Sequence, residues 1–294
     1  MKKFAVICSH VLAHIWSWLP SRFNLYLGKF LAFLWIDVFQ VRRQVIFSNL
    51  NLAFPNMDQE QKKKIARACM QNMCRSFFDV IKIPSISTDW INSNVIVEGI
   101  ENFEKAKAKK KGILFLSLHL GSGDLATAVI SRDIIPSYII TKRFKNQFLD
   151  NFWFALRGAS KTQFIDAHAK RNAFDILAAL KKQHGVIFVL DQFMGMPYGV
   201  ESLFFGHKTG TAYGLAVFAK KTQAPVICIH TYWDNNDKLH ICFGERIDLS
   251  AFSSDDDESY KRNVTNRFNL ALENVIRQHP EHWMWVHRRW KTFE

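Results

Sequence analysis

The chain has 294 residues, of which 48% are hydrophobic and 22% are charged, with only 13 glycines and 7 prolines. This composition excludes a disordered, collagen-like or low-complexity chain, because the apolar fraction is ample for a packed core. The formal net charge of +13 predicts an anionic partner. A nucleic acid, a phospholipid surface and an acidic carrier protein all meet that requirement.

Residues 1–57 form a hydrophobic, basic segment in which Asp37 is the single acidic residue. No run in it reaches the ~20 uninterrupted apolar residues of a spanning helix, and no small-residue cleavage site marks a signal peptide. We predict a helical anchor that lies on, or dips into, a bilayer, with Trp16, Trp18 and Trp35 at headgroup level. The alternative is a helical hairpin packed on its own domain.

Residues 58–294 are predicted to form an α/β domain. An amphipathic helix over Met57–Val80, with Asn56 or Asp58 as its cap, precedes short apolar runs that alternate with helical patterns. Strands are expected at Val95–Val97, Ile113–Leu118, Tyr138–Thr141, Gln163–Ile165, Val186–Leu190, Pro225–His230 and Leu239–Phe243. Helices are expected at Asn102–Lys110, Leu125–Arg132, Gln147–Leu156, Arg171–Gln183, Thr211–Lys221 and Tyr260–His279. This alternation predicts a mixed, mostly parallel sheet flanked by helices.

The strongest candidate site follows the strand predicted at Ile113–Leu118. That strand delivers His119 to its carboxyl end, and Asp124 opens the next helix. Gly121 and Gly123 between them permit a tight turn with close backbone approach. A carboxylate five residues after a histidine can orient the imidazole and leave its other ring nitrogen as a general base. The alternative is a helix cap at Asp124 and a core histidine.

Three further polar clusters follow predicted strands, and all four are expected to converge at one edge of the sheet. The first holds Arg143 and Lys145, with Arg157 one helix later, and the second is the glycine-containing loop that begins at Asp191. The third, Phe204–Gly214, is expected to be a loop that leads into a helix, which suits anions.

The sequence lacks the motifs of serine hydrolases, nucleotide-binding proteins and zinc sites. Ser122 lies in Gly-Ser-Gly-Asp, which is not a nucleophile elbow, and no phosphate-binding or dinucleotide-binding glycine fingerprint occurs. The five cysteines form no CxxC pair, and no cysteine or carboxylate set completes a zinc site beside His279, His282 and His287. We therefore predict no metal, no cofactor and no nucleic-acid partner, because the basic residues form no recognisable nucleic-acid-binding module.

Seven segments, taken in order over nearly the whole chain, resemble the lysophospholipid acyltransferase superfamily. The similarity is to the bacterial late acyltransferases of lipid A biosynthesis, the lauroyl and myristoyl transferases. It is carried by Ser48–Pro55, His119–Asp124, Arg143–Asp150, Asp191–Gln192, Phe204–Gly206, Ala219–Val226 and the closing segment His279–Lys291.

The resemblance implies an enzyme at the cytoplasmic face of the bacterial inner membrane. It would move a fatty acyl chain from acyl carrier protein, or coenzyme A, to a hydroxyl of a membrane lipid, a lipid A precursor. His119 would be the base and Asp124 its partner. The implied substrate-binding residues are Gly121, Arg143, Lys145, Arg157, Asp191, Arg288 and Arg289. Among these, the arginines and Lys145 would clamp phosphates, and Asp191 would orient one of the arginines. Backbone N–H groups around Gly121–Asp124, or Arg157, would face the developing oxyanion.

Two departures concern the acceptor. Many lipid A members have Glu at Asp124, and Asn-Trp where this chain has Ser122-Gly123. An ornithine lipid, a glycolipid or a pigment lipid is therefore an alternative acceptor. A non-catalytic lipid- or carrier-binding relative is a further alternative, against which the intact His119–Asp124 pair argues.

Overall fold

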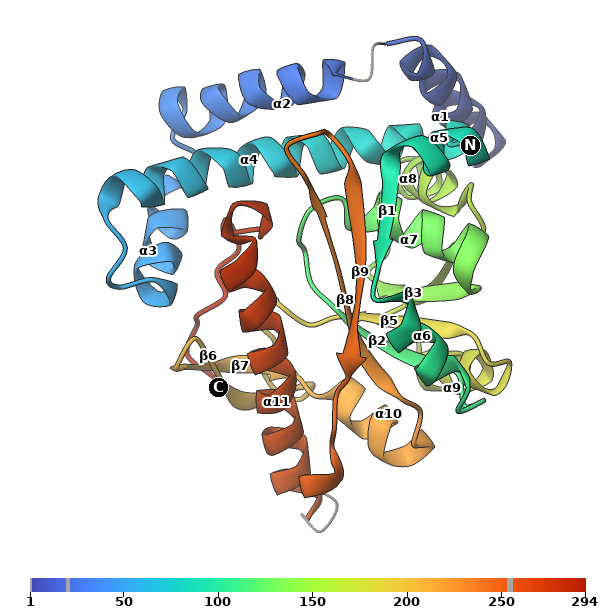
Figure 1. Cartoon of the computed structure of the whole chain (residues 1–294), viewed down its shortest axis with the longest axis vertical. Coiled ribbons are helices and arrows are strands. Elements are labelled where there is room, and N and C mark those ends of the chain that lie inside the picture. The colour runs from blue at the N-terminus through green and yellow to red at the C-terminus, as the bar shows by residue number, and fades with distance from the viewer. Residues whose placement is uncertain (1, 20–21, 253–255) are drawn as a thin grey trace.

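The computed structural model describes residues 2–19, 22–252 and 256–294. A seven-stranded sheet with strand order β1-β9-β8-β2-β5-β3-β4 forms its centre (Figure 1). The strands are β1 (Val95–Glu98), β2 (Ile113–Ser117), β3 (Ser137–Thr141), β4 (Gln163–Asp166), β5 (Gly185–Val189), β8 (Val226–Trp233) and β9 (Leu239–Arg246). Only the β8–β9 pairing within this sheet is antiparallel, so the sheet is mixed and mostly parallel, as predicted.

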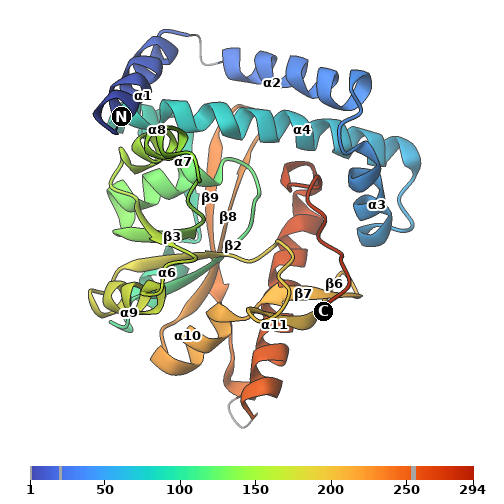
Figure 2. The same cartoon turned by 180° about the vertical axis from the view of Figure 1, so that it is seen from behind.

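Helices cover both faces of the sheet, which explains why its central strands are continuous apolar runs. On β2, Ile113 and Phe115 face one core, while Leu114 and Leu116 face the other. The first core is closed by α6 (Ile100–Lys107) and α7 (Gly123–Val129), and the second by α9 (Asn172–Lys181), α10 (Gly214–Thr222) and α11 (Asp257–Gln278). Figure 2 shows these layers from behind.

The N-terminal helices lie across one end of this assembly (Figure 1). They are α1 (Lys2–Ser17), α2 (Phe23–Phe33), the π-helical turn η1 (Leu34–Val38), α3 (Arg43–Ala53) and α4 (Gln59–Lys82), and α2 runs along α4 while α1 packs on α8 (Gln147–Gly158). Asp58 caps α4 through the N–H of Gln61, as predicted. Gly28 allows the close approach of α2, because a Cβ there would lie 3.1 Å from the carbonyl oxygen of Gln71. The division into segments 1–57 and 58–294 stays a prediction.

The segment before α10 differs from the prediction. Gly199–Phe204 (β6) and His207–Ala212 (β7) form an antiparallel hairpin, so the expected anion-binding loop at Phe204–Gly214 and the helix start at Thr211 are wrong. The polar side chains that made this segment resemble a loop are buried against α11, where Asn269 donates to Ser202 and Thr211. A short helix, α5 (Thr88–Asn94), was also not predicted.

After α11, a 3₁₀ turn, η5 (Pro280–His282), leads into an irregular segment that meets the chain after β2 through a bridge between Leu120 and Trp283. Trp283 and Trp285 are almost completely buried there. Asn49 of α3 ties this segment down, because its Nδ2 donates to the carbonyl oxygens of Trp285 and His287 at 2.7 Å each.

Replacing Asn49 by Ala leaves two carbonyl groups without that donor. We expect Asn49→Ala to lower the free energy of unfolding by about 2 kcal/mol, since a buried polar group without a partner costs about 1–3 kcal/mol. Urea unfolding measures this, with the exposed Asn51→Ala on the same helix as the control. Equal stability of the two variants would contradict the assignment.

Candidate active site

Two neighbouring parallel strands bring His119 and Asp191 together. Ser117 of β2 and Val189 of β5 are partners in the register of these strands, and the N–H of Leu190 extends the pairing to the carbonyl oxygen of Ser117 at 3.1 Å. His119 and Asp191 each follow by two residues, so they leave the carboxyl edge of the sheet side by side. Such strand ends are where sites form in α/β sheets.

The carboxylate of Asp191 holds both the backbone and the side chain of His119. Oδ1 lies 2.8 Å from Nδ1 of His119, and Oδ2 accepts from the His119 N–H at 3.0 Å and from Nε1 of Trp283 at 2.8 Å. Asp191 is 2% exposed, whereas the side chain of His119 is 42% exposed. With Nδ1–H donating to the carboxylate, Nε2 of His119 carries the lone pair that a base needs.

In the His119–Asp191 pair, the charged form of each side chain is stabilised by the opposite charge of its partner. Burial acts to lower the pKa of His119, but the charge and hydrogen bond of Asp191 outweigh it and raise this pKa above its ordinary 6.5. Burial acts to raise the pKa of Asp191, but the charge and hydrogen bonds of His119, together with Trp283, hold it below its ordinary value. Asp191 therefore stabilises the imidazolium that forms when His119 takes a proton.

Asp124 does not occupy the place predicted for it. Its Oδ1 accepts from Nε and Nη2 of Arg157 at 2.8 and 2.6 Å, so the carboxylate that bonds to His119 is Asp191 instead. The physical reason is geometric: the first turn of α7 carries Asp124 toward Arg157 in the last turn of α8, whereas β5 delivers Asp191 directly beside His119. The hydrogen bonds of Asp191 go to His119 and Trp283 and not to an arginine, so the prediction that Asp191 orients an arginine is wrong.

The other predicted basic residues occupy different environments. Arg143 pairs with Asp150 and stacks on the ring of Phe154 at 3.7 Å, while Lys145 and Arg288 are exposed. Arg289 is completely buried, and burial lowers its pKa to about 10.

The buried Arg289 guanidinium belongs to the packing of the β6–β7 hairpin. Its Nη1 donates to the carbonyl oxygen of Gly210 at 2.7 Å, and its Nη2 donates to the hydroxyl of Thr211 at 2.6 Å. These bonds direct the guanidinium inward, so the prediction that Arg289 clamps a substrate phosphate is wrong.

The two glycines of the loop have different surroundings. Gly121 has φ +60°, and a Cβ there would lie 2.3 Å from the carbonyl oxygen of Thr231, so only glycine fits. Its N–H donates to the carbonyl oxygen of His282 at 3.1 Å, so this N–H does not face a substrate oxyanion, while that role for the other N–H groups up to Asp124, or for Arg157, stays a prediction. A Cβ on Gly123, in contrast, would meet open space.

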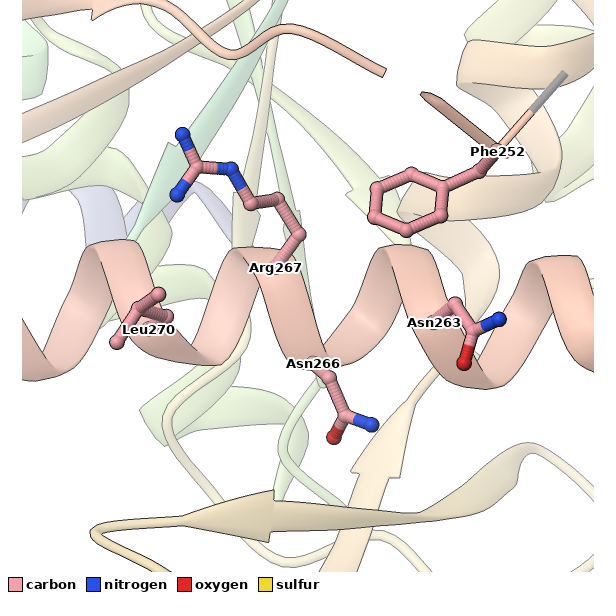
Figure 3. Close-up of a pocket in the computed structure, with 5 residues that line it drawn as sticks. All are labelled: Phe252, Asn263, Asn266, Arg267 and Leu270. Atoms are coloured by element: carbon pink, nitrogen blue, oxygen red, sulfur yellow. The ribbon is translucent and has the colours of Figure 1, made fainter. Parts of the chain in front are cut away.

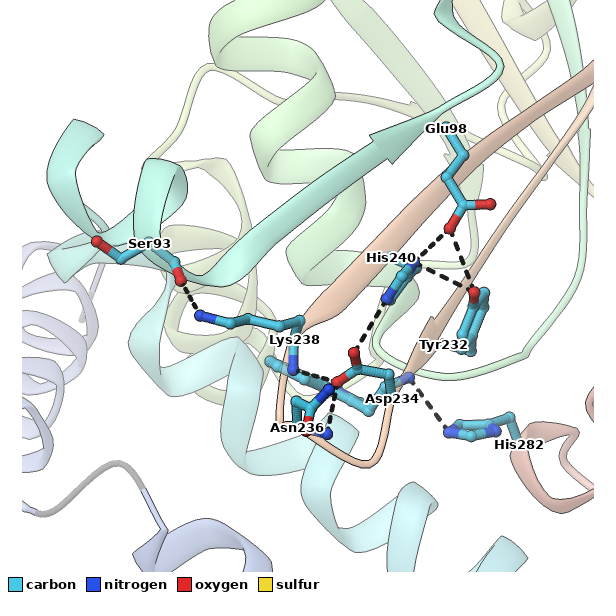
Figure 4. Close-up of polar contacts among 9 residues, drawn as sticks. Ser93, Glu98, Tyr232, Asp234, Asn236, Lys238, His240 and His282 are labelled. Carbon is cyan, nitrogen blue, oxygen red and sulfur yellow. Dashed lines mark hydrogen bonds and ion pairs between the residues drawn. The ribbon is translucent and has the colours of Figure 1, made fainter.

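A second group of titratable residues lies at the end of β8. The ligand-type atoms of His279, Glu281 and His282 all lie within 4.8 Å of one another, so a carboxylate does accompany these histidines, contrary to the prediction. Both ring nitrogens of His282 have partners, because Nδ1 lies 2.9 Å from Glu281 and Nε2 accepts from the N–H of Trp233 at 3.2 Å. Figure 4 shows the hydrogen bond of His282 to Trp233 and, beside it, the contact between Asp234 of the β8–β9 turn and His240 of β9.

Two surface pockets lie apart from His119. One is lined by Phe252 and the α11 residues Asn263, Asn266, Arg267 and Leu270 (Figure 3). Another is lined at the amino end of β8 by Pro225 and Val226, at the edge of the sheet opposite to His119. The candidate site is therefore defined by its polar contacts and by the exposed imidazole.

The fold and this site define a class of protein: an α/β enzyme with a histidine–carboxylate pair at the carboxyl edge of its sheet. The model of the bacterial lipid A biosynthesis acyltransferase family matches residues 3–292. The chain belongs to this family and is an acyltransferase of lipid A biosynthesis.

Its relatives are distant but are aligned over most of their length. The chain is 23% identical over 288 residues to the lipid A biosynthesis palmitoleoyltransferase of Escherichia coli (strain K12), which covers 96% of this chain and 90% of that protein. It is 23% identical over 261 residues to the lipid A biosynthesis lauroyltransferase of the same organism, with 85% and 79% covered. A lipid A biosynthesis acyltransferase of Haemophilus influenzae is 23% identical over 241 residues, with 81% and 72% covered.

The pH behaviour of His119 tests its bond to Asp191. Because the folded pKa is raised above 6.5, the interaction stabilises the protein below that pH and is lost as the pH rises through the raised value. We expect Asp191→Asn to lower the pKa of His119, as measured by NMR titration of histidine-labelled protein. Asp166→Asn, at the end of β4, is the control. An unchanged His119 titration in Asp191→Asn would contradict the pairing.

Proposed function

We propose that the chain transfers a fatty acyl group from the thioester of acyl carrier protein, or of coenzyme A, to a hydroxyl of a lipid A precursor. The observation that carries this proposal is the His119–Asp191 pair, in which a buried carboxylate fixes one ring nitrogen and the ring is partly exposed to a substrate. The family supplies the reaction class.

In the proposed mechanism, Nε2 of His119 removes the proton from the acceptor hydroxyl as its oxygen attacks the thioester carbonyl carbon. The new ester C–O bond forms, the C–S bond breaks, and the imidazolium returns its proton to the departing thiolate. Asp191 stabilises the imidazolium between these two transfers. A thioester is already activated, so no covalent acyl-enzyme is required.

The Asp124–Arg157 pair lies close enough to influence the base. The charge of Asp124 acts to raise the pKa of His119, and that of Arg157 acts to lower it. We assign the pair to fixing the first turn of α7 beside His119. Lys145 and Arg288 are exposed cations that we propose for the acceptor phosphates, together with Arg143, two residues before Lys145.

A second candidate function is acyl transfer to another lipid, such as an ornithine lipid, a glycolipid or a pigment lipid. It is favoured by the open space at Gly123, close to the base, which admits an acceptor of different shape. Mass spectrometry of the membrane lipids of a deletion strain distinguishes the acceptors, because the missing acyl group identifies the product.

His119→Ala tests the proposed base. Loss of a general base costs about 10²–10⁴ in rate, so we expect kcat for acyl transfer to fall at least ~100-fold with either donor. Turnover of acyl carrier protein and coenzyme A thioesters measures the effect, with the exposed His207→Ala as the control. Near-normal turnover by a folded His119→Ala variant would remove His119 from the mechanism.

The outer faces of the N-terminal helices support attachment to the cytoplasmic surface of the inner membrane. No helix among the described residues combines the length and apolarity needed to cross a membrane. Small residues face inward on α1 and α2, whereas large apolar side chains face outward on α1, α2 and η1, and Trp18, directly after α1, is 77% exposed. The exposed apolar residues there include Phe4, Ile7, Val11, Ile15, Tyr26, Phe30, Phe33 and Val38. This pattern is typical of helices that lie in the bilayer interface.

Substitution of two of these side chains tests the bilayer attachment. We expect Trp18→Ser combined with Phe30→Ser to weaken binding to vesicles of anionic phospholipid at least ~10-fold, because a buried aromatic side chain contributes about 1.5–3 kcal/mol. Vesicle co-sedimentation measures the binding. Phe174→Ser, which is equally exposed but lies on α9, is the control. Unchanged binding of the double variant would contradict attachment through α1 and α2.

A further inference from the structure

The hydroxyl of Ser122 anchors the loop that follows β2. Ser122 is fully buried, and its Oγ donates to Oδ2 of Asp79 at 2.6 Å and accepts from Nε1 of Trp233 at 2.8 Å. Although Ser122 directly precedes α7, its side chain does not cap that helix. Both hydrogen bonds of the Ser122 hydroxyl therefore join its loop to other elements, which are α4 and β8.

Asp79 connects this loop to the N-terminal helices. It belongs to α4 and is 1% exposed, and its Oδ1 accepts from Nδ2 of Asn24 on α2 at 3.4 Å. The Oδ1 of Asn24 in turn accepts from Nε1 of Trp16 on α1 at 2.9 Å. A buried carboxylate is tolerated only when its oxygens are hydrogen-bonded, so the donors Asn24 and Ser122 fix the position of Asp79.

Arg75 of α4 contacts both hydrogen-bond partners of Ser122, which are Trp233 and Asp79. Its guanidinium stacks 3.4 Å from the ring centroid of Trp233 and pairs with Asp237 at 2.6 Å. Its Nε lies 3.8 Å from Oδ2 of Asp79, which places a positive charge beside the buried carboxylate. Arg75 therefore connects Trp233, the other partner of Ser122, to α4 and, through Asp237, to the β8–β9 turn.

The same loop carries His119 and Asp124, and each of its bends is held by a different element. Asp191 holds His119, the carbonyl of His282 holds Gly121, and Arg157 holds Asp124. Ser122 lies between these points, so a shift at its position moves the base and the start of α7 relative to each other. A misplacement of about 1 Å can cost about 10²-fold in rate.

We propose that Asp79 is a positioning residue for the acyl transfer, an inference that rests on the function proposed above. Through its bond to Ser122, Asp79 fixes the loop from His119 to Asp124 against α4. Asp79 touches no reacting atom in this role.

The first test reads the environment of His119 without an activity assay. In histidine-labelled protein, we expect Ser122→Ala and Asp79→Asn to lower the pKa of His119 by about half a unit or more, because a loosened loop weakens the bond to Asp191. Glu60→Gln, an exposed acid on the same helix α4, should leave it unchanged. Ser122→Ala removes a single oxygen, so it decides the test even where Asp79→Asn does not fold. An unchanged His119 titration in folded Ser122→Ala would overturn the proposal.

The second test separates positioning from general stability. We expect each variant to lose at least ~10-fold in kcat with KM for the acyl donor within about twofold, and the double variant to lose no more than Asp79→Asn alone. Folded variants with kcat within about twofold of wild type would overturn the positioning role. If the wild-type protein transfers no acyl group to any of the acceptors, the proposed function fails, while the NMR titration still decides whether Asp79 anchors the loop.

Discussion

Asp191 is a buried carboxylate with three donors from two distant segments, and the geometry of the site depends on satisfying it. Two of the donors belong to His119 at the end of β2, and the third is the indole of Trp283 after α11. A buried charge destabilises a fold unless it is paired and hydrogen-bonded, so each donor must be held in place. This requirement fixes both the orientation of the His119 ring and the path of the C-terminal segment across the carboxyl edge of the sheet.

The C-terminal segment is held from its other side by the N-terminal helices. Besides Asn49 of α3, the thiol of Cys69 donates to the carbonyl oxygen of Trp283 at 2.9 Å, and Nδ2 of Asn72 donates to that of Glu281 at 2.9 Å. These supporting side chains belong to α3 and α4, and α4 is also the helix on which α1 and α2 pack. Helix α4 therefore connects the helices that carry the proposed membrane-facing surface with the C-terminal segment beside His119.

Much of the fold follows from local sequence, because strands buried on both faces are continuous apolar runs and the helices between them are amphipathic. The central strands of the main sheet were predictable for this reason, whereas the β6–β7 hairpin was not, since Ser202, Thr209 and Thr211 bury polar side chains against Asn269 and Arg289. The polarity of that segment indicates a loop only if it is assumed to face water. Here it faces partners that lie about 60–90 residues further along the chain.

The same contrast between local and long-range contacts explains which residues of the site were predictable. His119 was predictable from its place at a strand end, but its carboxylate partner was not, because β5 lies beside β2 only after β3 and β4 have been placed beyond it. Asp124 is the nearer carboxylate in sequence, yet α7 turns it toward Arg157. The two carboxylates therefore differ in their part of the site. Asp191 bonds to Nδ1 of His119 and has the larger effect on its pKa, which it raises. The Asp124–Arg157 pair holds the start of α7, and its two opposite charges act on the pKa of His119 in opposite directions.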